Sequence, residues 1–275
     1  MNVIALAPPA ARVPLLGALL ERQRTLALYG LALLLLAIPV LVLQTVDGRT
    51  LGSGVNVWIK PAKFILSVAL FALTSAWFFG YVRPERRGSW PVRAVVSLIL
   101  IAGTLELLYI GWQAAHGLDS HFNRSAPVYE IMYALMGVFA VALTASVFPL
   151  AWEIARRPAP GISRDFAAAV VTGLLLTFIL GGALGGYMSA QPAHSVGAVG
   201  GAVPIFGWNR AGGDLRVAHF LGIHAQQAIP ILALLIAKHA PRTRWLLLGA
   251  GSLAYVAVTL GIFFQAIGGR PLLPL

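Results

Sequence analysis

The chain has 275 residues, of which 59% are hydrophobic and only 11% charged, and its mean hydropathy is +0.82. Because soluble domains are typically about 25% charged, this composition indicates an integral membrane protein. The absence of cysteine excludes disulfides, covalently attached c-type haem and cysteine-ligated iron–sulfur clusters.

The hydropathy pattern predicts an all-α fold, a polytopic transmembrane helical bundle that forms one domain over residues 1–275. A helix needs roughly 20 apolar residues to cross a bilayer, and seven stretches of the chain reach that length. The seven predicted spans are 25–45, 61–82, 92–115, 127–151, 165–188, 215–237 and 243–267. The segment 13–24 predicts either a short interfacial helix or an extension of the first span.

The basic residues predict the orientation of the bundle. Assigned to alternate sides of the spans, 13 of the 20 Lys and Arg residues fall on one side and 7 on the other. The positive-inside rule then places the N-terminus in the cytoplasm and the C-terminus outside. The first span lacks a small-residue cleavage site, which predicts an uncleaved anchor in the bacterial inner membrane. The net charge of +11 then indicates contact with membrane lipids and no nucleic acid.

The loops on the predicted outer side differ from the short basic loops on the cytoplasmic side. Five of the six histidines belong to that outer side, and only His239 falls on the other. The segment 189–214 is long and rich in glycine but keeps Val, Ile, Phe and Trp. Long loops in compact domains are usually functional. We therefore expect 189–214 to form a folded extracytoplasmic lid or a re-entrant segment.

The fifth predicted span carries two overlapping GxxxG pairs. They consist of Gly181, Gly182, Gly185 and Gly186. Small residues at this spacing let another helix backbone approach closely. Internal packing, a homodimer through these glycines, and room for a flat cofactor remain alternative interpretations.

The sixth predicted span carries His219 and His224. A spacing of five residues separates two side chains by about 140° around a helix, so they do not share a face. The HExxH arrangement, which places two imidazoles on one metal, is absent. On a continuous helix His219 stacks over Gln226 and His224 lies beside Gln227. Pro230 is expected to bend this span. Hydrogen-bonded structural histidines and cofactor ligands remain alternatives.

Glu106 lies about two turns below the predicted outer surface, and Gln113 follows on the same helix face. A carboxyl group at that depth must be neutral, paired or hydrated. Glu106 is thus interpreted either as the counter-ion of Lys60 or Lys63, or as a group that handles protons. A polar chamber in the outer leaflet is expected, roofed by 189–214. Its predicted lining is Lys63, Glu106, Gln113, His121, Glu130, His219 and His224.

Three sequence blocks resemble an uncharacterised family of bacterial polytopic membrane proteins. They are NVWIKPAKF at 56–64, SHFN at 120–123 and GGDLRVAHFLGIHAQQAIP at 212–230. A weaker resemblance is to haem A synthase, in the order LGGALGGYM, GGAVPIFGWN and VAHFLGIHA. That family holds b-type haem between histidines of different helices, which implies His121 with His219 or His224 here. It has eight spans in two equivalent halves, whereas seven are predicted here.

The leading functional hypothesis is a haem- or metal-binding redox-type protein, with haem b or a divalent metal as its cofactor. The alternatives are a non-catalytic membrane sensor or assembly partner, and a zinc-dependent intramembrane lipid hydrolase. The last resembles the alkaline ceramidase and adiponectin-receptor class in span number but lacks its HxxxH pair. The catalytic candidates are Glu106, Glu130 and Lys63. The cofactor-binding candidates are His121, His219, His224, Gln113 and Gln227. The metal-ligand candidates are His121, His194, His219 and His224.

Overall fold

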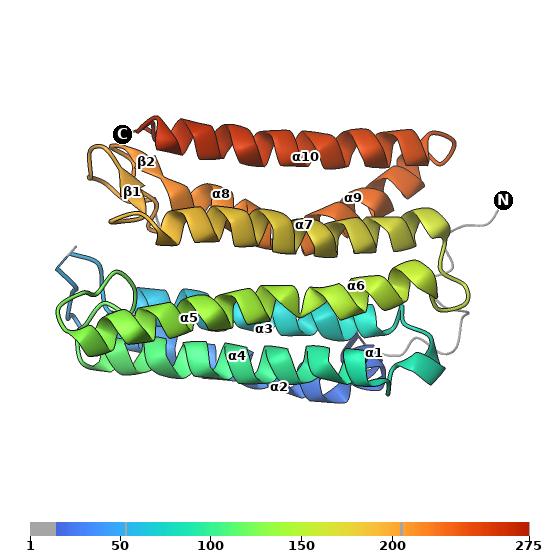
Figure 1. Cartoon of the computed structure of the whole chain (residues 1–275), viewed down its shortest axis with the longest axis horizontal. Coiled ribbons are helices and arrows are strands. Elements are labelled where there is room, and N and C mark those ends of the chain that lie inside the picture. The colour runs from blue at the N-terminus through green and yellow to red at the C-terminus, as the bar shows by residue number, and fades with distance from the viewer. Residues whose placement is uncertain (1–14, 53, 204–205, 275) are drawn as a thin grey trace. The chain divides into compact units, whose positions relative to one another are not determined.

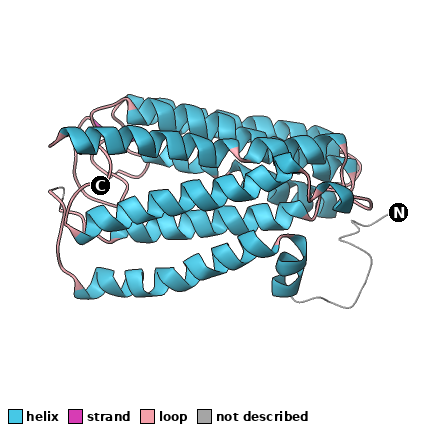
Figure 2. Cartoon of the chain, turned by 60° about the horizontal axis from the view of Figure 1, so that its bottom comes forward, coloured by secondary structure: helices cyan, strands magenta, loops and turns pink. Residues whose placement is uncertain are grey.

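The computed structural model describes residues 15–52, 54–203 and 206–274, which are mostly helical (Figure 2). Within these described residues, six helices are long and apolar enough to cross a membrane, or seven if one bent helix pair counts as a span. The predicted all-α, multi-span architecture is therefore confirmed. The inside-to-outside direction of the spans stays a prediction.

The elements are labelled in Figure 1. In chain order they are α1 (Leu15–Arg22), α2 (Arg24–Val46), α3 (Ile59–Phe79), the short 3₁₀ helix η1 (Pro84–Arg86), α4 (Trp90–Ala115), α5 (Pro127–Ala145), α6 (Val147–Arg156), α7 (Arg164–Ser189), β1 (Ser195–Val196), β2 (Gly213–Asp214), α8 (Leu215–Ile223), α9 (Ala225–His239) and α10 (Arg244–Ile267).

The described chain divides into two compact units. The N-terminal unit ends at Gly161 and holds α1 to α6, and the C-terminal unit begins at Ile162 and holds α7 to α10. In the N-terminal unit α2 and α3 pack through small and branched side chains. These include Leu33, Ala37, Ala62, Ile65, Val68 and Ala69. In the C-terminal unit α7 packs along both α8 and α9. That residues 1–275 form a single domain stays a prediction.

The segment before the first span forms a separate short helix, α1. Gln23 interrupts the chain with an extended backbone (φ −155°), and its side chain accepts a hydrogen bond from the Leu26 N–H. Because this contact satisfies a free N–H at the start of α2, the sequence favours a new helix here over a continuation of the old one. Residues 13 and 14 of the predicted interfacial helix lie outside the described residues.

The fourth predicted span extends to Arg156 and is interrupted once, at Ser146, between α5 and α6. Pro149 explains the position of this break. Proline has no N–H to donate to the carbonyl four residues earlier, which is that of Ala145, the last residue of α5. The Ser146 hydroxyl also donates to the Leu143 carbonyl at 2.6 Å, a contact that often accompanies a helix bend.

The sixth predicted span is broken, but not where the sequence suggested. The chain bends by 58° between α8 and α9, at His224, whereas Pro230 lies inside α9. The largest change of direction in this span is therefore at His224 and not at Pro230, and a further bend of α9 at Pro230 stays a prediction. Figure 1 shows that α8 and α9 run in different directions.

Side chains from neighbouring helices stabilise the break at His224. The Tyr255 hydroxyl of α10 donates to the Leu221 carbonyl at 2.5 Å. The Gln226 N–H donates to the Thr177 hydroxyl oxygen of α7 at 2.9 Å. Non-helical backbone inside a membrane is tolerated only where such contacts satisfy its polar groups. Packing partners distant in the chain therefore decide where this span breaks.

The glycines of α7 serve internal packing at two of the four predicted positions. A Cβ on Gly181 would lie 2.8 Å from Ile223, and a Cβ on Gly185 would lie 2.8 Å from the His219 ring, so both glycines face α8. Gly182 and Gly186 have nothing within 4 Å of their Cβ positions. A homodimer through the α7 glycines stays a prediction. Gly182 and Gly186 are the two glycines with space for a second chain to approach.

Gly222 of α8 provides a test of this close packing. A Cβ there would lie 2.9 Å from the Gly181 backbone nitrogen. We expect Gly222→Ala to lower the free energy of unfolding by about 1–3 kcal/mol, because the two helix backbones must move apart. The matched control is Gly182→Ala, which should leave stability unchanged or raise it by up to about 1 kcal/mol, since alanine favours helix. Thermal unfolding in detergent measures both; equal losses in the two variants would contradict this account of the α7–α8 contact.

Candidate functional site

The break between α8 and α9 gathers several polar side chains within the C-terminal unit. His219 lies one turn before the break, His224 stands at the break itself, and two glutamines follow in the first turn of α9. The break therefore removes the stacking of His219 over Gln226 that a continuous helix would give. It leaves His224 beside Gln227, as expected.

His219 is held by the backbone of α7. Its Nδ1 lies 3.1 Å from the Gly181 carbonyl oxygen. A carbonyl oxygen can only accept a hydrogen bond, so in this contact Nδ1 carries the proton and Nε2 keeps its lone pair. The imidazole is thus oriented, and its Nε2 is chemically able to act as a ligand.

His224 is oriented in a similar way by a side chain in the first turn of α9. Its Nδ1 lies 3.4 Å from Oε1 of Gln227, a long contact that still favours Nδ1 as the donor. The ring also contacts Phe220, with ring centroids 4.3 Å apart and planes tilted by 57°. His224 is half-buried, so its imidazole is less enclosed than the side chain of Gln226.

Gln226 is the most unusual polar group of this region. Its side chain is 0% exposed, and neither Oε1 nor Nε2 has a hydrogen-bond partner within the described part of the chain. A buried amide without partners costs on the order of 1–3 kcal/mol per unsatisfied group. Natural structures keep such groups rarely, and a bound polar group or water usually explains them.

The loop that leads into α8 is folded. β1 and β2 pair in antiparallel fashion, with Ser195 opposite Asp214. Asn209 holds the loop from inside: its side chain accepts from the Gly200 N–H at 3.0 Å and donates to the Ala198 carbonyl at 2.7 Å. The role of 189–214 as an extracytoplasmic lid stays a prediction, and residues 204 and 205 lie outside the described residues.

Asp214 connects this loop to the start of α8. Its carboxylate accepts from the Arg216 guanidinium, with Nη2 at 2.6 Å and Nε at 2.9 Å, and from the Asn209 N–H at 2.8 Å. His194 Nδ1 lies 4.0 Å away. Burial raises the pKa of Asp214, but the hydrogen bonds and charge of Arg216 outweigh that effect and lower the pKa below its ordinary value. Asp214 is therefore ionised at neutral pH.

Aromatic rings lie between the loop and the break. Phe206 stacks on Trp208 with ring centroids 4.5 Å apart, and both rings contact Phe220 of α8 at 5.7 Å. Phe220 in turn contacts His224. The folded loop is thus packed onto the side of α8 that leads to the break.

The N-terminal unit holds a second group of predicted site residues. Glu106 is only 3% exposed, and its Oε1 has no hydrogen-bond partner among the described residues. Lys60, at the start of α3, is close enough for its charge to act on the Glu106 carboxyl. Whether Lys60 or Lys63 is the counter-ion of Glu106, or whether Glu106 handles protons, stays a prediction.

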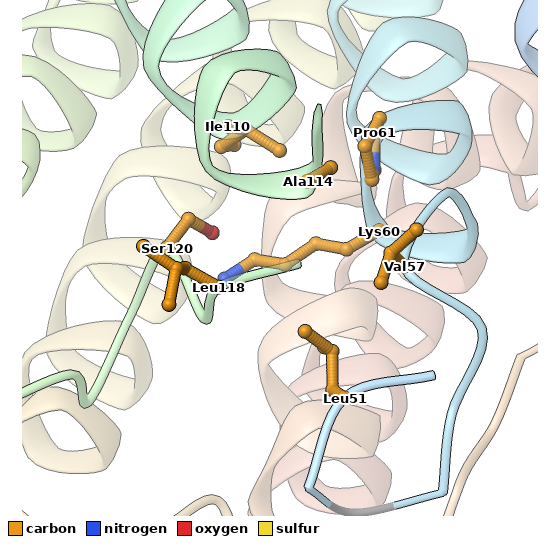
Figure 3. A pocket seen from close by; sticks show the side chains of 8 residues that line it. All are labelled: Leu51, Val57, Lys60, Pro61, Ile110, Ala114, Leu118 and Ser120. Carbon is orange, nitrogen blue, oxygen red and sulfur yellow. The ribbon is translucent and has the colours of Figure 1, made fainter. Parts of the chain in front are cut away.

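Lys60 also borders a small cavity, where its side chain extends toward Leu118 and Ser120 (Figure 3). The cavity has a volume of about 10 Å³, close to the minimum for a single water molecule. It is far too small for a flat cofactor.

His121 packs between aromatic rings of the N-terminal unit. Its ring centroid lies 6.0 Å from that of Phe64 and 5.7 Å from that of Tyr133. Burial, together with the nearby charge of Lys60, lowers the pKa of His121 well below its ordinary value, so the imidazole is neutral at pH 7. The next residue, Phe122, has a left-handed backbone (φ +60°), which is rare for a bulky residue and is found at sites held under strain.

The remaining predicted residues differ in burial. Gln113 is fully buried and donates to the Asp119 carbonyl at 3.2 Å. Lys63 is half-buried, whereas Glu130 is exposed. Within the N-terminal unit the structure brings Lys60 near both Glu106 and His121. Within the C-terminal unit it brings His219 and His224 to one break. The chamber that combines residues of both units stays a prediction.

Sequence reasoning missed the residues that build the break and the loop. They are Thr177, Tyr255, Asn209 and Arg216. For Asp214 and Arg216 a signal existed, because an Asp two residues before an Arg at a helix start can both cap the helix and bind the guanidinium. Thr177 and Tyr255 lie on other helices, and their spacing in the chain carries no signal.

Among the residues that the structure describes, no group of three or more His, Asp and Glu side chains is arranged to hold a metal ion. The metal site expected from His121, His194, His219 and His224 stays a prediction. Comparison with protein-family models, with curated proteins and with solved structures finds no match to this chain.

Proposed function

We propose that this integral membrane protein binds haem b at the break between α8 and α9 and acts as a redox-type protein, with His219 as an iron ligand. The contact between His219 Nδ1 and the Gly181 carbonyl oxygen, 3.1 Å long, carries the proposal. Histidines that bind a metal almost always donate their other ring N–H to a carbonyl or a carboxylate.

The surroundings of His219 support this role. The contact with Gly181 fixes the ring and makes Nε2 a stronger base, which favours coordination. The neighbouring core is apolar, formed by side chains such as Leu180, Leu184 and Phe263. An apolar environment suits the porphyrin ring, and burial is one of the means by which a protein tunes a haem iron.

His224 is the second candidate ligand. Gln227 holds its Nδ1 as the Gly181 carbonyl holds that of His219. Gln226 contributes a buried amide with no partner among the described residues, which is able to hydrogen-bond a polar group of a ligand at the break. Haem when bound supplies one-electron redox chemistry. The protein side chains orient the ligand and exclude water.

Haem is preferred over a zinc centre because of the number of protein ligands required. A catalytic zinc site uses three protein ligands plus water, and no such group occurs among the described residues. Haem iron needs only one or two axial side chains. The order of three sequence blocks, which resembles that of haem A synthase, also favours haem, as do histidines placed on helices of a bundle.

The test is a visible spectrum and a metal analysis of the protein purified from membranes and again after incubation with haemin. We expect a Soret band that is lost in His219→Ala. His219→Met, which keeps an axial ligand, should retain haem with a shifted band. The matched control is His239→Ala, an exposed histidine at the end of α9, which should leave the spectrum unchanged.

Other outcomes would overturn the proposal. No Soret band after incubation with haemin would favour the non-catalytic sensor or assembly partner. Stoichiometric zinc without haem would favour the lipid hydrolase. A Soret band unchanged in both His219→Ala and His224→Ala would place haem elsewhere. The orientation with the N-terminus in the cytoplasm of a bacterium, and the inner membrane as location, belong to the same proposal.

A further inference from the structure

A polar cavity lies in the N-terminal unit at the end where α2 and α4 begin. It has a volume of about 230 Å³ and is open to the surface. Its lining consists of Gln23, Thr25, Arg87, Arg93, Val96 and Ser97. Two arginines, two hydroxyl groups and one amide thus surround one small space, and no acidic residue is among the described residues that line it. This cavity is independent of the proposed haem site, which lies in the other unit.

The arginines of this region are held by backbone groups at the end of α3. Arg87 donates from Nε to the Val82 carbonyl at 3.1 Å and from Nη2 to the Gly80 carbonyl at 3.2 Å. Arg22 donates to the Trp77 carbonyl at 2.8 Å, and its guanidinium lies 3.7 Å from the Trp77 ring centroid. Carbonyls at a helix C-terminus carry partial negative charge, which draws both cations to the same place.

Among the described residues, this arrangement leaves an excess of positive charge beside the cavity. Burial, followed by the charge of Arg22, lowers the pKa of Arg87, and the nearby Glu85 only partly offsets this. The like charges of Arg22 and Arg87 therefore repel each other. Arg93 adds a third, exposed cation on α4. An anion seated in the cavity would relieve this repulsion.

The donors of the cavity match a phosphate group. Gln23 Oε1 accepts a hydrogen bond from the Leu26 N–H, so the group that Gln23 can offer an anion is its amide nitrogen, a donor. Thr25 and Ser97 add hydroxyl donors. Arginine binds phosphate oxygens through two parallel N–H groups. All these side chains are donors able to face one anion.

The position of the cavity indicates a lipid source for that phosphate. It lies at the first turns of two membrane-spanning helices, α2 and α4. Trp90, the first residue of α4, is 81% exposed, which is typical of the headgroup level of a bilayer. The volume is smaller than the roughly 300–1,000 Å³ of pockets that enclose a drug-sized ligand, so it suits a headgroup whose acyl chains remain in the bilayer.

We propose that the cavity formed by Gln23, Thr25, Arg87, Arg93 and Ser97 is a binding site for the phosphate of an anionic phospholipid. Basic pockets between membrane helices bind such headgroups, and each Lys or Arg near the surface contributes about 1 kcal/mol. The site fixes the ends of α2, α3 and α4 against the lipid surface.

The experiment measures the thermal unfolding of the full chain in a neutral detergent during titration with short-chain phosphatidylglycerol. Parallel titrations use phosphatidylcholine and inorganic phosphate. We expect phosphatidylglycerol to raise the unfolding temperature more than phosphatidylcholine, with no protection by inorganic phosphate at the same concentration. In Arg93→Gln the apparent Kd for phosphatidylglycerol should rise about five-fold.

Arg157→Gln is the matched control, since it removes one exposed positive charge outside the cavity. It should bind phosphatidylglycerol as the wild type does. Equal affinities in wild type and Arg93→Gln, or equal losses in Arg93→Gln and Arg157→Gln, would overturn the site. Protection by inorganic phosphate equal to that by phosphatidylglycerol would overturn the lipid source. Ser97→Ala, a milder change, should weaken binding without affecting the fold.

Discussion

Replacement of Glu106 by Gln is expected to lower the free energy of unfolding by about 3 kcal/mol. The Glu106 carboxyl is 3% exposed, and the charge of Lys60 acts on it. Breaking a buried pair by removing one partner typically costs about 3–5 kcal/mol, because the other charge is left without compensation. The lower end applies here, since Lys60 is half-buried. Unfolding in mixed micelles with increasing denaturant measures the loss.

A second substitution separates the two interpretations of Glu106. If Lys60 is the counter-ion, Lys60→Met in the Glu106→Gln background should restore most of the lost stability. Lys63→Met, one turn further along α3, is the matched control and should restore little. If Glu106 instead handles protons, Glu106→Gln should unfold like the wild type but lose the pH response of activity, and neither lysine substitution should matter.

Replacement of Asp214 by Asn is expected to release the loop before α8 and to cost about 3 kcal/mol. The Asp214 side chain is 1% exposed and that of Arg216 is 27% exposed, so removing the charge leaves a half-buried guanidinium without its anion. The Asn209 N–H also loses a charged acceptor. Limited proteolysis of the loop, together with thermal unfolding in detergent, measures the effect.

The same residue predicts a pH dependence with a definite sign. The folded-state pKa of Asp214 lies below the ordinary value, which is about 3.9 in an unfolded chain. The stabilisation by Asp214 is therefore fully present above about pH 4 and is lost as the pH falls through the folded-state pKa. Between pH 7 and about pH 4 we expect a constant contribution. Below that range the wild type should lose stability more steeply than Asp214→Asn.

The chain contains a matched control for Asp214. Asp47 binds Arg49 in the same way, two residues along, with Nη2 at 2.6 Å and Nε at 2.9 Å. The Arg49 side chain is 51% exposed, and water can replace its lost partner. Asp47→Asn should therefore cost clearly less stability than Asp214→Asn. Equal losses of stability in Asp47→Asn and Asp214→Asn would show that burial of the Asp–Arg pair does not determine how much the pair stabilises the fold.

The sequence alone determined the helical spans. Each span is a run of about 20 or more mostly apolar residues, which is the length that a helix needs to cross the hydrocarbon core of a bilayer. Hydropathy therefore predicts both the number of spans and their approximate ends. α7, predicted at 165–188, runs from Arg164 to Ser189, and α10, predicted at 243–267, runs from Arg244 to Ile267. That Gly181 and Gly185 share one helix face also follows from a local pattern, whereas their contact with α8 does not. A helix brings every fourth residue to one face whatever surrounds it.

Tertiary structure decided where the sixth span breaks and which groups meet there. Pro230 is the local signal for a bend, yet the chain bends at His224, because Tyr255 and Thr177 satisfy the backbone groups freed there. These partners come from α10 and α7, and no spacing within 215–237 could reveal them. The orientation of His219 likewise depends on a carbonyl of α7. Local patterns fix helix faces and lengths, whereas hydrogen bonds between helices depend on how distant segments pack.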